Sequence, residues 1–257
     1  MRLEMVLIGD ARKQVKNPYR KTSKESDMTD PGNAENLSNE AQEARAAVES
    51  GENIRDAMRN ITMAALSRGQ LDAQETKRVV RSVLQGASLG VSKAGDKSRQ
   101  VLSESLAGID EALAKSAEAT KLAIEEAAGR LRDYGKHDLE RSFNDMRTLE
   151  GMLLETVKDV AEHSAAEAQE ILQSLLRHAK DSGTTTGATV KSAITALEQK
   201  LGRTLREVAA AGSDAALSTS SNLAEAAAGF LAGIAEVLDA KAKSMRHETG
   251  MKERNPR

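Results

Sequence analysis

The chain has 257 residues and a formal net charge of −2, and charged residues of both signs make up 30% of it. Because positive charge is not in excess, a nucleic-acid partner is not expected. Cysteine is absent, so disulfides and thiolate metal sites are excluded and a reducing, cytoplasmic location is expected. Aromatic residues make up only 2% of the chain. Proline occurs only at positions 18, 31 and 256, so no proline interrupts a helix between positions 31 and 256.

Residues 1–37 are predicted to form a disordered basic and polar tail. Residues 1–27 carry seven Lys or Arg against four Asp or Glu, and they show no hydrophobic periodicity. Because MTDPGN at Met28 would itself make a plausible start, residues 1–27 are interpreted either as a tail or as the product of a misassigned start codon. Residues 244–257 are predicted to form a second disordered tail.

Residues 38–94 are predicted to form a region of short helices. After the Ser50-Gly51 break, apolar side chains recur on one helical face until Gly69 ends the segment; they are Ile54, Met58, Ile61 and Ala65. The run from Asp72 to Glu75 is typical of a capping box that opens the next helix. The two short helices are expected to pair as a hairpin.

Residues 97–243 are predicted to form an elongated bundle of long antiparallel amphipathic helices, so the predicted fold class is all-α. Apolar side chains recur at steps of three and four, which places them on one face at 100° per residue. The stripes run from Leu102 to Leu131, from Leu139 to Leu175, from Val190 to Val208 and from Leu223 to Leu238. The simplest interpretation of these stripes is an ordinary intramolecular bundle in which they bury each other.

Glycine-bearing segments mark the predicted ends of these helices. Gly135 is expected to end the first long helix, and Asp138 to cap the second. The segment from Ser182 to Gly187 is the clearest loop, and Gly212 to Asp214 is expected to be a kink or short turn. The resulting helices have about 38, 44 and up to 56 residues, and no interruption is predicted between Asp138 and Ser182.

No catalytic or metal-binding constellation stands out. The segment from Gly86 to Gly90 matches G-x-S-x-G, the pattern of the nucleophile elbow of hydrolases. That elbow follows a strand, whereas a helical stripe precedes this segment, so the two glycines are expected to permit close helix packing. The residues three before the histidines at 137, 163, 178 and 247 are never glutamate, so the Glu-x-x-His pattern of a di-metal bundle is missing. The chain is therefore predicted to be non-enzymatic, with no cofactor and no metal.

The pattern LAGI-x-E-x-L occurs twice, within residues 105–116 and within FLAGIAEVLDAKA from Phe230 to Ala242. The first copy has Asp110 where the second has Ala235 and lies in a long charged helix, so it is expected to be structural. The second copy is the candidate interface, because one helical face carries Leu223, Ala227, Phe230, Ile234 and Leu238.

Two observations bear on how this second copy meets a membrane or a partner helix. Its Gly229 and Gly233 form a G-x-x-x-G, which in a soluble helix allows close backbone approach. The longest uncharged apolar window runs only from Ala226 to Ala235, against the ~20 residues that a membrane span needs, so no transmembrane segment is predicted.

Several segments resemble an uncharacterised all-helical proteobacterial family, over roughly Val48 to Lys243. They are VRSVLQGASLGV from Val80, ATKLAIEEAAGRLRD from Ala119, HDLERSFNDMRTLEGMLLETV from His137, and FLAGIAEVLDAKA from Phe230. That family has no established activity to place on particular residues. More remotely, in composition and helix pattern only, the chain is similar to phasins, which coat cytoplasmic polyester storage granules.

Two functions stay open at this point. The phasin resemblance implies a surface-active protein that lays its apolar stripes on a polyester granule or lipid surface, which would make it cytoplasmic and granule-associated. The alternative is a soluble oligomeric coiled-coil scaffold or stress-related structural protein that buries the stripes between protomers. Self-association is expected because the alanine-rich stripes bury little apolar area each. Bulky aromatics on the stripes would favour the first function, and only Phe143 and Phe230 are present.

Overall fold

The computed structural model describes residues 37–69, 71–129, 136–211, 227–229, 231–233 and 235–236. Throughout this part of the chain the regular elements are helices, and no strand occurs in it. The α-helices are α1 (Asn39–Ser50), α2 (Ile54–Ser67), α3 (Ala73–Gly90), α4 (Ser98–Gly129), α5 (Lys136–Glu162), α6 (Ala166–Ser182) and α7 (Thr185–Ala211). Two 3₁₀ turns, Val91–Lys93 and Gly95–Lys97, join α3 to α4. The predicted all-α class is confirmed.

Local sequence signals set the ends of the short helices. Ser38 caps α1 by accepting a hydrogen bond from the Ala41 amide, and Gly51 ends the helix with a φ of 71°, a left-handed conformation that favours glycine. Asp72 caps α3, because its Oδ1 accepts from the Glu75 amide at 2.8 Å, as the capping-box pattern predicts. The Glu75 carboxylate itself binds Arg78.

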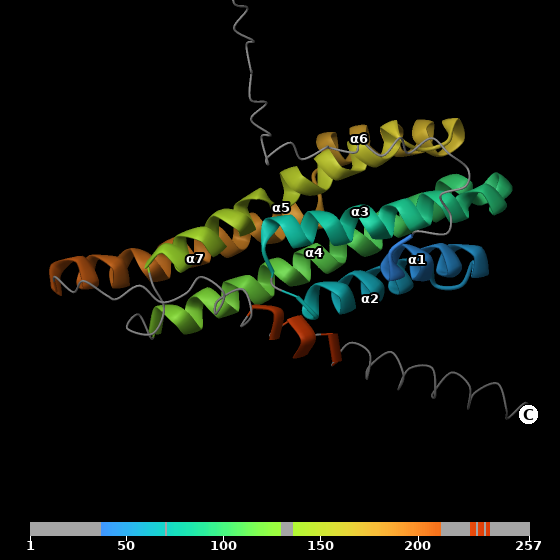
Figure 1. Ribbon diagram of the computed structural model, residues 1–257. Helices are drawn as coiled ribbons and strands as arrows, with labels where there is room; N and C mark the ends of the chain where they lie inside the picture. The colour runs from blue at the N-terminus through green and yellow to red at the C-terminus, as the bar shows by residue number, and fades with distance from the viewer. Residues whose placement is uncertain are drawn as a thin grey trace, which may run out of the picture.

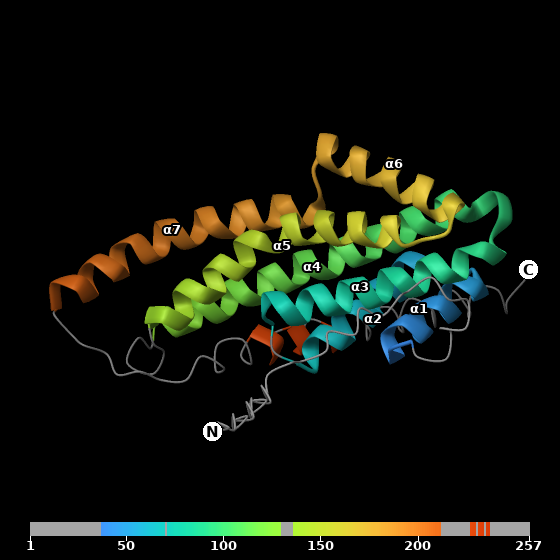
Figure 2. The ribbon, with the colours of Figure 1, turned by 45° about the horizontal axis from the view of Figure 1, so that its top comes forward.

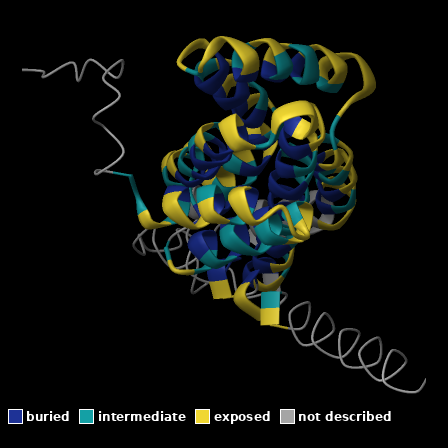
Figure 3. Ribbon diagram, turned by 90° about the vertical axis from the view of Figure 1, so that its right-hand side faces the viewer, coloured by how far each residue is buried: buried dark blue, intermediate teal, exposed yellow. Residues whose placement is uncertain are grey.

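The helices form one elongated bundle with α4 at its centre (Figure 1). On one side α1 packs against α3, and α2 packs chiefly against α4 rather than against α3, the helix with which it was expected to form a hairpin. On the other side α7 packs against α4 and α5, and α6 lies on α5 (Figure 2). In the view along the bundle, buried positions face inward and exposed positions cover the outer surfaces (Figure 3).

The predicted apolar stripes form the core. On α4 the stripe residues Leu102, Ile109, Leu113, Ala117 and Ile124 are all completely buried. The α5 stripe meets them from the facing side, and buried residues from all seven helices belong to one continuous cluster. Each large side chain buried in this way contributes about 1.5–3 kcal/mol, so the stripes hold the bundle together by covering each other.

The long helix predicted between Asp138 and Ser182 is interrupted, and this prediction is wrong. The chain turns at His163–Ala165, so that α5 ends at Glu162 and α6 runs back along it. Between Val160 and Ala168 the stripe has no apolar side chain larger than alanine, so the core does not hold a straight helix there. The Ser164 hydroxyl donates to the Val160 carbonyl oxygen, which satisfies that group at the end of α5.

The other predicted helix ends agree with the structure only in part. The loop at Ser182 is present but shorter than expected, since only Gly183 and Thr184 separate α6 from α7. Asp138 lies inside α5 and so does not precede it. Residues 1–36, 130–135, 212–226 and 237–257 lie outside the described residues, together with the predictions for both tails, for Gly135 and for Gly212–Asp214.

Candidate functional site

Glycines set the closest helix crossings. A Cβ atom at Gly86 would collide with the backbone carbonyl of Ala41, and one at Gly90 would lie 2.9 Å from the Val48 side chain. The G-x-S-x-G match therefore lies within α3 and lets α1 approach it, which confirms the packing interpretation. The Ser88 hydroxyl within this match pairs with the Ser164 hydroxyl at 2.8 Å and so ties α3 to the α5–α6 turn.

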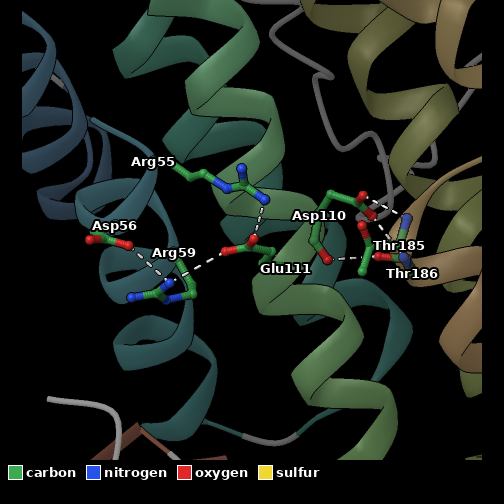
Figure 4. A network of polar contacts seen from close by, with 7 residues as sticks. All are labelled: Arg55, Asp56, Arg59, Asp110, Glu111, Thr185 and Thr186. Atoms are coloured by element: carbon green, nitrogen blue, oxygen red, sulfur yellow. Dashed lines mark hydrogen bonds and ion pairs between the residues drawn. The ribbon is translucent and has the colours of Figure 1, made fainter. Parts of the chain in front are cut away.

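A polar network extends from both sides of α4, at two consecutive residues (Figure 4). Glu111 faces α2 and binds the guanidinium groups of Arg55 and Arg59, and Arg59 also binds Asp56 at 2.9 Å. The hydrogen bond with Glu111 raises the pKa of Arg55 above its ordinary value. Beside this network a Cβ atom at Gly108 would collide with the Arg55 carbonyl, so the ion pairs lie where α2 and α4 cross most closely.

Asp110 faces the opposite way and holds the start of α7 (Figure 4). Its two carboxylate oxygens accept from the backbone amides of Thr185 and Thr186 at 2.8 and 2.9 Å, and its backbone carbonyl accepts from the Thr186 hydroxyl. The first amides of a helix have no partner within the helix, and a negative charge is favourable beside them. Asp110 therefore supplies both the acceptors and the charge, which confirms the structural role expected for the first LAGI copy.

A second carboxylate supports the same helix start. Glu150 of α5 accepts from the Thr184 hydroxyl at 2.8 Å, and that hydroxyl accepts in turn from the Gly187 amide. A side chain at Gly187 would collide with the Glu150 carboxylate. We call this arrangement the α7 clasp; it consists of Asp110, Glu150, Thr184, Thr185 and Thr186. The sequence pattern predicts only a loop at the Thr-Thr-Thr-Gly run, although its threonines are typical of a helix cap.

A cavity of about 150 Å³ lies beside the α7 clasp, between α4, α5 and α6. Its lining is mainly leucine, valine and alanine, together with four polar side chains. The wall residues are Leu106, Ala107, Leu153, Leu154, Val157, Leu175, Leu176 and Ala179. The polar residues are Ser103, Asp110, His178 and Thr184. Its lining is more apolar than that of either of two further hollows in the described residues.

These two other hollows are larger and more open. A polar cleft of about 540 Å³ lies at the α1–α2 turn, where Lys93 pairs with Glu49 at 2.8 Å. A groove between α4 and α7, the α4–α7 groove, has a volume of about 550 Å³ and is lined by Glu118, Lys121, Leu122, Ala188, Thr189, Ser192 and Ala193. Leu122 is one of two large apolar side chains that are exposed in the described part of the chain; the other is Leu89 on α3.

The displaced pKa values have structural causes. The hydrogen bond from Arg78 lowers the pKa of Glu75, and the hydrogen bond from Lys93 lowers the pKa of Glu49. Burial raises the pKa of Asp145, and the nearby charge of Asp72 raises it further. None of these carboxylates lines the cavity beside the α7 clasp. These pKa shifts therefore result from ion pairs and partial burial at helix surfaces.

The predicted interface is described only in part. Of its five residues, Ala227 is 2% exposed and belongs to the core cluster, whereas Leu223, Phe230, Ile234 and Leu238 lie outside the described residues. Leu231, which the periodicity did not single out, is completely buried. A Cβ atom added at Gly229 or Gly233 would meet no described atom within 4 Å, so neither glycine marks a close helix approach among the described residues.

Histidines and carboxylates do not converge in the described residues. His163 contacts the backbone oxygen of Asp159, and His178 is exposed near Ser182. No group of three or more metal-ligating side chains occurs in that part of the chain. Within the same limits, none of the helices is both long enough and apolar enough to span a bilayer.

The family comparison covers nearly all of this architecture. The model of a family of unknown function, DUF6781, matches residues 29–240. The chain belongs to this family. The matched residues include α1 to α7, the α7 clasp and the cavity, so these are features of a DUF6781 chain. Neither the comparison with curated proteins nor that with solved structures found a match.

Proposed function

We propose that this DUF6781 chain is a non-enzymatic helical interaction protein that works as a scaffold by associating with a second copy of itself. One observation carries the proposal: in the described residues, the apolar stripes of the long helices are buried against each other in a single core. A protein whose stripes cover each other keeps a polar surface, and it meets partners through local patches on that surface.

The α4–α7 groove supports this proposal as the contact surface. Leu122 is 39% exposed at its edge, and small side chains of α7, among them Ala188 and Ser192, form its floor. Glu118 and Lys121 place both charges beside the same leucine. A twofold contact brings the same patch of two subunits together, so a surface with a protruding leucine, a trough of small residues and both charges is self-complementary.

Sedimentation at micromolar concentration tests this contact with two matched variants. Leu122→Lys puts a charge at the proposed contact, so the variant is expected to be monomeric while the wild-type chain is a dimer. Leu89→Lys makes the same change at the other exposed leucine, on α3, and is expected to remain dimeric. A monomeric wild-type chain, or equal dissociation of both variants, would show that the groove is not the contact.

The coat function that the phasin resemblance implies is a second proposal. The described part of FLAGIAEVLDAKA supports it, because Leu231 is buried while Ala232 and Glu236 are exposed, as in an amphipathic helix. Adsorption would require the buried face, whose described members are Ala227, Ala228 and Leu231, to leave the core. A fluorescent fusion that stays diffuse in cells with storage granules would rule this coat function out.

A further inference from the structure

We infer that the cavity between α4, α5 and α6 is a binding site for a small uncharged apolar molecule, or for one that carries a single hydroxyl group. The site is independent of the self-association proposed above, because the α4–α7 groove is formed by other residues. Four features support it: the size of the cavity, the chemistry of its walls, the anchoring of α6 and the charge in and beside the lining.

Size and wall chemistry define the ligand class. The volume of about 150 Å³ is that of an apolar cavity able to hold a molecule the size of benzene. Leu106, Leu154 and Leu175, one from each of the three helices, are only half-buried because they face this space. On the side that faces the cavity these three leucines are not covered by other side chains of the protein, and an apolar ligand would supply dispersion contacts there.

The helix that covers the cavity is held at both of its ends. At the start of α6, Ser164 is tied to Ser88 of α3. Beyond its end, Thr184 is tied to Glu150, and Asp110 holds the first turn of α7. Figure 2 shows that the C-terminal half of α6 stands away from the bundle before the chain turns into α7. The two anchored ends hold α6 in place over this space, so the space is preformed.

Carboxylates in and beside the lining of the cavity select against anions. Asp110 lines the cavity directly, and Glu150 lies behind Thr184 at hydrogen-bond distance. Two carboxylates repel a negatively charged ligand, whereas a hydroxyl group can donate to a carboxylate or to the Ser103 hydroxyl. A neutral alcohol should therefore bind and the carboxylate with the same chain length should not. His178, also in the lining, is exposed to solvent.

Methyl NMR of the full-length, leucine-labelled chain tests the site with three probes: benzene, pentan-1-ol and pentanoate. Benzene and pentan-1-ol are expected to give saturable shifts at the methyl groups of Leu106, Leu154 and Leu175, while pentanoate gives none. Absence of saturable shifts with the two neutral probes would overturn the site. Shifts of equal size at Leu102 and Leu113 in the central core would overturn its location.

Filling the cavity provides the matched test. Ala107→Leu adds bulk from the floor and Ala179→Leu adds it from the cover, whereas Ala166→Leu makes the same change at an exposed position on α6. Both filling variants are expected to keep the helical circular dichroism signal and lose benzene binding, and the Ala166 variant is expected to bind as wild type does. Undiminished binding in a folded filling variant would contradict the proposal. If one filling variant fails to fold, the other still decides.

Discussion

At the scale of single residues, the absence of a side chain decides which helices can touch. Gly86 and Gly108 each lie where an added Cβ atom would collide with the backbone carbonyl of another helix, that of Ala41 in α1 and that of Arg55 in α2. Gly151 of α5 is exposed and has open space around it. The same residue type therefore has a packing role at two positions, and at the third it only weakens the helix.

These glycines allow a matched stability test. Gly86→Ala should destabilise the protein by about 1–3 kcal/mol, because α1 must move away from α3 to relieve the collision. Gly151→Ala should stabilise it by about 0.5–1 kcal/mol, because alanine favours the helix and meets nothing. Denaturant midpoints at unchanged slope measure both effects. A neutral Gly86→Ala would mean that α1 and α3 are packed less closely than the structure has them.

At the scale of helices, sequence periodicity predicted the elements well and their contacts poorly. The α4 stripe and the cap at Asp72 follow from neighbouring residues, so a single sequence contains them. The turn at His163–Ala165 was missed because the residues on either side continue the same helical period. The bond between Asp110 and the Thr185 amide joins residues 75 positions apart, and no local pattern reports such a contact.

Loss of the α7 clasp should destabilise the whole of α7. Asp110→Ala removes the acceptor of two backbone amides at a helix start, and the loss of such a cap costs about 0.5–2 kcal/mol. We expect faster hydrogen exchange at Thr185 and Thr186, with lower global stability. Asp96→Ala, at an exposed position in the 3₁₀ turn before α4, should change neither quantity. Unchanged exchange in the Asp110 variant would mean that α7 is held by its apolar face alone.

At the scale of the molecule, a single core runs through helices that the sequence divides into two regions. Composition separates short helices at residues 38–94 from long ones at 97–243, yet α2 packs chiefly on α4, and α3 packs on α5. Met58 of α2 and Leu197 of α7 are both completely buried in the same cluster. A shared core couples the two regions, because neither can lose its packing without exposing the apolar side chains of the other.

Unfolding of the described helices should therefore be one cooperative transition. Met58→Ala and Leu197→Ala each remove a buried side chain at a cost of about 2–5 kcal/mol, and both should shift the midpoint of that same transition. Circular dichroism in a denaturant series measures the midpoint, and coincidence with a second probe, such as the methyl NMR signals of Leu102 and Leu113, tests whether the transition is two-state. Two separate transitions, of which Met58→Ala moves only one, would instead make the short helices an independent unit. The division seen in composition would then be a true domain boundary, and the packing of α2 on α4 would be a contact between domains.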